Sequence, residues 1–131
     1  MRYLSPALLL LATLATACKK TNPPVAALDG TYSGTFQRQY AGSGQVSRVT
    51  LVFSSATWTG ISQTPKYPGL CNGTYRISRD NKITFTNACF WTADFDWSLI
   101  LSQEYELRLT GNNVEIVRDS PPYRDVYTLT K

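Results

Sequence analysis

Side chains able to do acid, base or nucleophilic chemistry are scarce in this chain. It contains no histidine, so no Ser-His-Asp or Cys-His arrangement can form and a histidine-based zinc site is excluded. Asp94 and Asp96 form a closely spaced acidic pair in a loop, and two carboxylates serve as acid and base in glycosidases. Two acids so close in a loop are more often surface charges or turn formers, and the other ligands of a calcium loop are missing. The sequence therefore predicts that the protein is not an enzyme and holds no cofactor or metal ion.

The first 17 residues have the composition of an export signal. Arg2 supplies a positive start, and residues 4–15 supply an apolar run shorter than the about 20 residues of a membrane-spanning helix. Small residues then lead to Cys18, and residues 14–18, LATAC, resemble the lipobox of bacterial lipoprotein precursors. The resemblance implies that Cys18 becomes the first mature residue and carries fatty-acyl chains such as palmitate, which anchor it to a membrane. Ordinary cleavage after Ala17, which would leave Cys18 a plain thiol, is the alternative.

Residues 18–27 are polar and then proline-bearing, which predicts a short, stiff spacer before a single domain of residues 28–131. Lys19 and Lys20 suit the anionic head groups of a membrane surface. By resemblance to Gram-negative lipoproteins, the absence of Asp directly after Cys18 favours the outer membrane of the cell, with the domain facing the periplasm. We expect the domain to be a monomer.

The net charge of the chain is concentrated at its N-terminus. The whole chain carries 13 basic and 9 acidic side chains, a formal net charge of +4. Without Arg2, Lys19 and Lys20, 10 basic side chains remain against the same 9 acidic ones, which leaves a net charge of +1 for the domain. A basic surface for nucleic acid therefore has little support, and no nucleic-acid partner is expected.

Cys71 and Cys89 remain as an even pair once Cys18 is assigned to the lipid, and in an oxidising compartment such a pair forms a disulfide by default. A two-ligand metal site is the alternative, but it would need histidines or further cysteines. The hairpin around residues 79–81 supports the disulfide. If the numbers of paired residues sum to 160, Ile77 faces Ile83 and Tyr75 faces Phe85. Cys71 then lies opposite Cys89, on the same inward-facing side of the hairpin.

The domain is predicted to be all-β, because short alternating runs rich in β-branched and aromatic residues are separated by Gly, Asn, Asp and Pro. Alternation of apolar and polar residues is typical of antiparallel sheets with one face on a core. Closure removes exposed edges, so we predict a small antiparallel up-and-down barrel of eight strands, or nine if residues 97–102 and 104–110 are separate. A two-sheet β-sandwich is the alternative. The predicted strands are residues 30–39, 45–54, 57–63, 73–78, 82–88, 97–102, 104–110, 114–118 and 125–130. The predicted interior comprises Tyr32, Phe36, Phe53, Tyr75, Phe85, Leu107 and Tyr127.

Aromatic residues flank the cysteine pair. Because the disulfide would close the open end of its hairpin, the loops at residues 65–70 and 90–96 should meet at one rim. Tyr67, Phe90, Trp91 and Phe95 would gather there. Aromatic side chains on a braced loop suit a small apolar ligand, a sugar ring or a partner protein. The alternative is that they fold inward and plug the end of the barrel.

Three segments together resemble the small lipocalin-like (calycin-type) lipoproteins of the bacterial envelope. They are residues 28–34 (LDGTYSG), residues 71–75 (CNGTY) with the return to Cys89, and residues 127–129 (YTL). The resemblance implies a non-catalytic, lipid-anchored barrel that binds a small apolar ligand or a partner protein. An inhibitor of an envelope enzyme or an assembly partner acting through the aromatic rim, and a carboxylate-based hydrolase, are the alternatives.

Overall fold

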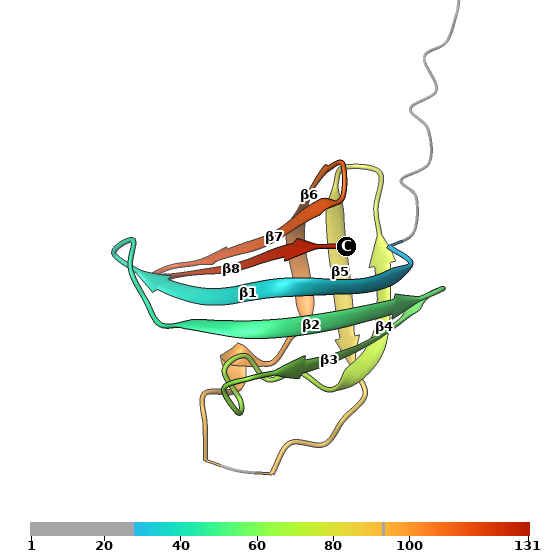
Figure 1. The fold of residues 1–131 in the computed structure, drawn as a ribbon. Helices are drawn as coiled ribbons and strands as arrows, with labels where there is room; N and C mark the ends of the chain where they lie inside the picture. Colours follow the sequence, from blue (N-terminus) through green and yellow to red (C-terminus); the bar gives the residue numbers. More distant parts are fainter. Residues whose placement is uncertain (1–27, 93) are drawn as a thin grey trace, which may run out of the picture.

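The computed structural model describes residues 28–92 and 94–131, which form a closed barrel of eight strands (Figure 1). The strands are β1 (Gly30–Tyr40), β2 (Val46–Ser54), β3 (Thr57–Ser62), β4 (Asn72–Ile77), β5 (Lys82–Asn87), β6 (Gln103–Thr110), β7 (Asn113–Ser120) and β8 (Tyr123–Thr130). Each strand pairs antiparallel with the next, and β8 returns to pair with β1. The up-and-down barrel is confirmed, and the closing pair excludes a two-sheet sandwich. The predicted signal peptide, Cys18 and the spacer lie outside the described residues.

One predicted strand is wrong. Residues 97–102 form no strand, because the chain makes a 3-10 helix, η1 (Trp97–Leu99), before β6 begins. The side chain of Asp96 caps η1 by accepting a hydrogen bond from the backbone N of Ser98 at 2.9 Å. A side chain that bonds to nearby backbone competes with strand pairing, so this local bond overrides the apolar alternation. The barrel therefore has eight strands and not nine. No helix in the described parts of the chain is long and apolar enough to cross a bilayer.

The hairpin of β4 and β5 has the predicted register. Tyr75 lies opposite Phe85 and Ile77 opposite Ile83, so the paired residue numbers sum to 160. A disulfide joins Cys71 to Cys89 just beyond the last pair of the ladder, as predicted. The apolar matching and the covalent bond thus select one register.

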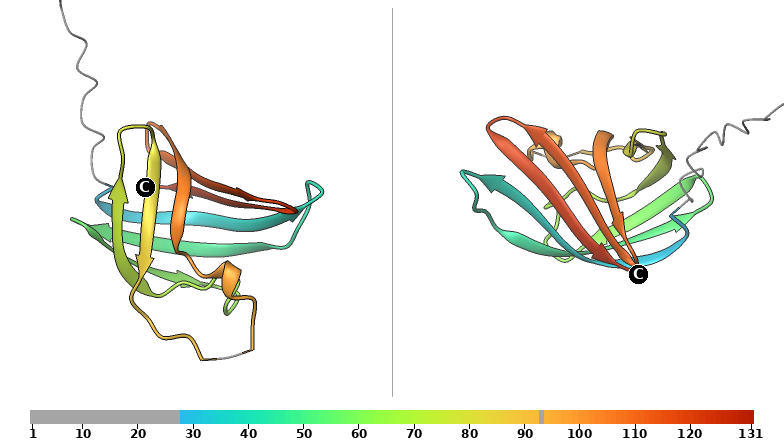
Figure 2. Two further views of the ribbon diagram at one scale, coloured as in Figure 1. Left: turned by 180° about the vertical axis from the view of Figure 1, so that it is seen from behind. Right: turned by 90° about the horizontal axis from the view of Figure 1, so that it is seen from above.

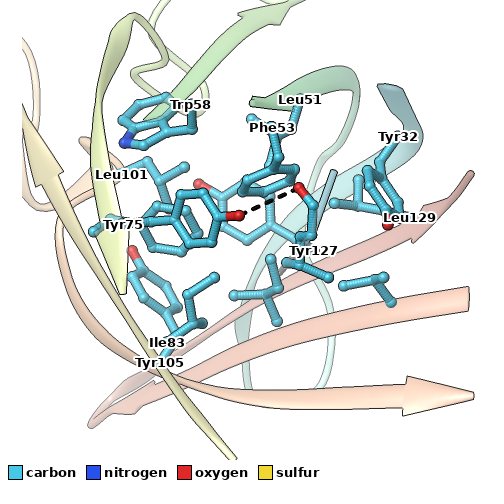
Figure 3. Close-up of a cluster of buried hydrophobic side chains, with 14 of the residues drawn as sticks. Tyr32, Leu51, Phe53, Trp58, Tyr75, Ile83, Leu101, Tyr105, Tyr127 and Leu129 are labelled. Carbon is cyan, nitrogen blue, oxygen red and sulfur yellow. Dashed lines mark hydrogen bonds between the residues drawn. The ribbon is translucent and has the colours of Figure 1, made fainter. Parts of the chain in front are cut away.

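Aromatic rings fill the interior of the barrel (Figure 3). The ring centroids of Phe36 and Tyr127 are 4.7 Å apart, those of Tyr127 and Tyr105 6.1 Å, and those of Tyr105 and Phe85 5.7 Å. The Tyr75 hydroxyl donates a hydrogen bond to the backbone oxygen of Leu28 at 3.3 Å and so holds the start of the domain to the core. All seven residues predicted for the interior are buried: Tyr32, Phe36, Phe53, Tyr75, Phe85, Leu107 and Tyr127.

Trp58 is a further buried residue that the sequence did not assign to the core. Its side chain is 1% exposed and its ring lies 5.7 Å from that of Phe85. A Cβ atom on the neighbouring Gly73 would lie 3.1 Å from the indole nitrogen of Trp58 and 1.7 Å from the backbone oxygen of Thr86. Only glycine fits there, because any side chain would clash with the backbone oxygen of Thr86 and would also press on the indole of Trp58.

The two ends of the barrel differ in their connections. We call one the short-turn end: it holds the turns at residues 55–56, 78–81 and 111–112. The start of β1 also lies there, beside the C-terminal Lys131 (Figure 2). The opposite end, called the loop end, holds the loops at residues 63–71 and 88–102, the shorter connections at residues 41–45 and 121–122, and the disulfide. The predicted contact residues all belong to the loop end.

Candidate functional site

The two long loops of the loop end are joined to each other, as the sequence predicts. The disulfide closes the ends of β4 and β5 from which the loops start. Backbone hydrogen bonds then pair the loops directly: Gly69 donates to the oxygen of Leu99 at 2.9 Å, and Leu101 donates to the oxygen of Gly69 at 3.0 Å. The loops therefore form one braced layer over the end of the barrel.

Tyr67 lies within this layer and contacts the core. It is half-buried, and its ring centroid is 5.2 Å from that of Phe36. Its hydroxyl donates a hydrogen bond to the oxygen of Gln45 at 2.8 Å and accepts one from the backbone N of Arg38 at 3.1 Å. Tyr67 thus ties the β3–β4 loop to β1 and to the β1–β2 connection, which is the role of a plug.

The other three predicted contact residues lie in the loop at residues 88–102. Trp91 and Phe95 are half-buried with their rings 5.5 Å apart, and the ammonium of Lys66 lies 5.4 Å from the Phe95 ring. Phe90 is 99% exposed. Trp97, which the sequence placed in a strand, extends the row: its ring is 6.4 Å from that of Phe95 and the residue is 58% exposed. Tyr67 therefore packs on Phe36, whereas Trp91 packs on Phe95. The row of rings formed by Trp91, Phe95 and Trp97 belongs to the loop at residues 88–102.

A buried ionic network at the loop end was missed by the sequence analysis. Arg38 of β1 donates from Nε and Nη2 to the two carboxylate oxygens of Asp125 of β8, at 2.7 and 2.8 Å. Arg118 of β7 donates from Nη2 to the same carboxylate at 3.1 Å. Asp125 is 2% exposed. A buried carboxylate between two guanidinium groups satisfies the requirement that buried charges be paired.

Arg38 also connects the barrel to η1. Its Nη1 donates to a carboxylate oxygen of Asp96 at 2.9 Å and to the hydroxyl of Ser98 at 2.7 Å, and its Nη2 donates to the backbone oxygen of Ser98 at 3.1 Å. The sequence holds a signal for this network, because Arg38, Arg118 and Asp125 all share the inward parity of their strands. Charged residues at inward-facing positions near the ends of strands indicate a polar layer between the apolar core and the end of the barrel.

These contacts set the ionisation of the site. Donation of a hydrogen bond to Asp125 raises the pKa of Arg38 above its ordinary value. Hydrogen bonding from the Ser98 side chain lowers the pKa of Asp96, which keeps that cap ionised. Burial raises the pKa of Tyr105 to about 12, against the opposing effect of Arg118, whose guanidinium carbon lies 4.7 Å from the ring centroid.

Asp94 and Asp96, the pair considered for catalysis, differ in their surroundings. Asp94 lies exposed in the loop, whereas Asp96 accepts hydrogen bonds from the backbone and hydroxyl of Ser98 and from Arg38. A carboxylate with these three donors is engaged in holding η1 to the barrel. In residues 28–92 and 94–131, no group of three or more Cys, Asp or Glu side chains is arranged to hold a metal ion.

Two concave surfaces accompany these residues. A polar cleft of about 180 Å³ lies between η1 and the ends of β1, β6, β7 and β8. A wide, open groove of about 610 Å³ runs over the outer face of β1, β2 and β3. The cleft is lined by Arg38, Trp97, Ser98, Ser102, Gln103, Arg118, Ser120 and Tyr123.

Comparison of the chain with protein-family models, with curated proteins and with solved structures finds no match. The class of protein is therefore defined by the architecture itself, a closed eight-stranded antiparallel barrel compatible with a lipocalin-like fold. Its distinguishing part is the braced, aromatic loop end.

Proposed function

We propose that this chain is a lipid-anchored protein of the bacterial cell envelope that binds a partner protein through the loop end of its barrel and catalyses no reaction. The observation that carries the proposal is the division of the aromatic side chains. One set fills the interior, while Phe90, Trp97, Tyr123 and Tyr40 remain exposed at the loop end. Exposed aromatic residues are typical of protein-binding surfaces.

The proposed anchor and the proposed binding surface lie at opposite ends of the barrel. The lipobox-like residues 14–18 place the lipid on Cys18, and a spacer of residues 18–27 leads to Leu28. Leu28 is buried at the short-turn end, where it accepts the hydrogen bond of Tyr75. A chain tethered there presents the loop end away from its attachment point, where a partner in the periplasm can reach it.

A packed interior favours a partner protein over a small apolar ligand. Leu51, Ile83 and Ile116 are 0% exposed and lie in one cluster with the aromatic rings. Protein interiors are packed to near-crystalline density, so an internal ligand would have to displace several of these side chains. A surface contact requires no such displacement. An inhibitor of an envelope enzyme is one form that this partner-binding function can take.

Site-specific photocrosslinking in the native host tests the proposal. A photoreactive residue at Phe90 should form a protein adduct, and the Trp97→Ala change in the same chain should reduce it. The matched control carries the photoreactive residue at Asn112, in the β6–β7 turn of the short-turn end, and should form no such adduct. Equal adducts at both ends, or an adduct at Phe90 that survives Trp97→Ala, would overturn the proposed surface.

The anchor is tested separately through Cys18. The Cys18→Ser chain should lack the mass of the acyl chains and should retain residues 1–17, because the thioether-linked lipid needs the thiol and the lipoprotein peptidase needs the lipid-modified cysteine. Ala26→Ser, in the spacer, is the control and should be acylated and cleaved like the wild type. A Cys18→Ser chain that is still processed and still fractionates with membranes as the wild type does would contradict lipidation at this residue.

A further inference from the structure

The polar cleft at the loop end has a charge imbalance among its lining residues. Two guanidinium groups, of Arg38 and Arg118, face it from β1 and β7, and no carboxylate lines it. The carboxylate that both arginines share, Asp125, is 2% exposed and lies behind them. The charged groups that line the cleft are therefore guanidinium groups, whereas their two carboxylate partners, Asp125 and Asp96, are not among its lining residues.

The two arginines are not equally satisfied. Arg38 makes five hydrogen bonds to Asp125, Asp96 and Ser98, which accounts for all of its donors. Arg118 makes one bond to the Asp125 carboxylate, at 3.1 Å, and donates otherwise only to backbone oxygens, at 3.2 Å to Ser102 and 2.8 Å to Ser98. Its Nε is buried with no acceptor. Both N–H groups of its Nη2 are used, and Nη1 donates one of its two, so the second N–H of Nη1 is the donor that the network leaves for a ligand.

The remaining walls suit a group of side-chain size. Trp97 and Tyr123 are 58% and 41% exposed and line the cleft together with the serine hydroxyls. Gln103, on the same wall, has a φ of 72°, a left-handed conformation that non-glycine residues rarely adopt and that occurs often at binding sites. A volume of about 180 Å³ is well below that of a drug-sized ligand pocket, so it holds one side chain rather than a whole cofactor.

We propose that this cleft binds a carboxylate side chain, Asp or Glu, of the partner protein, with Arg118 as the principal donor and Trp97 and Tyr123 packing against the methylene groups of that side chain. The inference rests on the proposed partner-binding function and names the chemistry that the partner presents. Charge complementarity selects an acidic group, because guanidinium groups pair with carboxylates through strong, charge-assisted hydrogen bonds.

The test is an NMR titration of the isotopically labelled, processed chain with a minimal probe, N-acetylglutamate α-methylamide, observed at the indole N–H of Trp97. The expected result is a saturable shift with a dissociation constant on the order of 1–10 mM, which weakens as salt is added. The uncharged isostere, N-acetylglutamine α-methylamide, should bind at least about tenfold more weakly.

Two variants and one control locate the site. Arg118→Gln should weaken binding of the glutamate probe at least about tenfold. Because Arg118 also contacts buried Asp125, Tyr123→Ala supplies a second test. It removes an exposed ring whose centroid lies 5.0 Å from the guanidinium carbon of Arg38 but removes no hydrogen bond of the network, and it should weaken binding several-fold. Arg124→Gln removes an arginine that pairs with Asp119 outside the cleft and should leave binding unchanged.

Several results would overturn the inference: no saturable shift, equal shifts with the acid and its amide, equal weakening by Arg124→Gln, or tighter binding of glucuronate, which would indicate a carboxylated sugar instead. The crosslinking experiment separates this inference from the proposed function. An adduct at Phe90 without glutamate binding removes the carboxylate cleft and leaves the partner surface. Glutamate binding without an adduct removes the partner surface and leaves an acid-binding cleft.

Discussion

The two ends of the barrel differ in the connections that join the strands and in the contacts that hold those connections in place. At the short-turn end the strands are joined by turns of a few residues, and the start of the domain is held by single bonds, such as that from the backbone N of Ser55 to Asp29 at 2.9 Å. At the loop end a disulfide, a buried network around Asp125 and the plug residue Tyr67 hold two long loops in place.

The long loops and the contacts that hold them are found only at the loop end, although short turns suffice to connect strands at the other end. Tight turns already satisfy their backbone groups and leave the barrel complete. Long loops require ordering of many more residues, which costs conformational entropy, and they persist in one conformation only when covalent or polar contacts offset that loss. Ordering the loop end costs more conformational entropy than ordering the short turns, yet its loops are firmly held. The proposed binding surface is therefore preorganised.

The largest expected effect is at the centre of the ionic network. Asp125→Ala leaves the buried guanidinium group of Arg38 without its main partner and should reduce the free energy of unfolding by about 3–5 kcal/mol. Asp29→Ala at the short-turn end removes one exposed hydrogen bond to Ser55 and should reduce it by about 1 kcal/mol. Urea denaturation of both variants measures the contrast. Equal losses at the two ends would show that the loop end is not specially held.

Removing the disulfide is expected to have the next largest effect. Cys71 and Cys89 are 18 residues apart, and closing a loop of that length stabilises the folded state by about 3 kcal/mol in the chain-entropy model. The double change Cys71→Ala and Cys89→Ala should reduce the free energy of unfolding by about 2–5 kcal/mol. The wild type under reducing conditions should lose a similar amount. Non-reducing peptide maps with both thiols free would refute the bridge.

Alkaline pH should weaken the barrel through Tyr105. The pKa of this tyrosine is about 12 in the folded protein and 10.0 for the unperturbed group, so the unfolded chain loses its proton first. The stabilising difference is fully present below pH 10 and is lost as pH rises through 12, about 2–3 kcal/mol in all. Tyr105→Phe should remove this contribution to the fall in the free energy of unfolding with rising pH. Stability measured against pH in both proteins tests it, and parallel curves would contradict the raised pKa.

The smallest expected effects distinguish plug from surface within the loop end. Tyr67→Phe removes a hydroxyl with two hydrogen bonds and should reduce the free energy of unfolding by about 1 kcal/mol. Phe90→Ala removes a side chain that is 99% exposed and should change it by less than about 0.5 kcal/mol. Thermal unfolding of the two variants is the measurement. A larger loss for Phe90→Ala than for Tyr67→Phe would reverse these assignments.

Much of the barrel could be predicted from local pattern. Alternation identifies which residues of a strand face the core, and it placed Phe53, Phe85 and Tyr127 inside. The β4–β5 register followed from apolar matching together with the position of Cys71 and Cys89, because a hairpin brings near neighbours in sequence face to face. The error at residues 97–102 arose because the side chain of Asp96 bonds to local backbone, a contact that alternation does not detect.

The sequence by itself determined the all-β class, the inward parity of the strands, the disulfide pair and the meeting of the two loops. Only the tertiary structure decided which polar groups meet, because Arg38 and Asp125 are 87 residues apart and become neighbours only when β8 closes on β1. The same holds for the packing of Tyr67 on Phe36 across the barrel end. Periodicity fixes the face on which a side chain lies, whereas its partner depends on closure and register over the whole sheet.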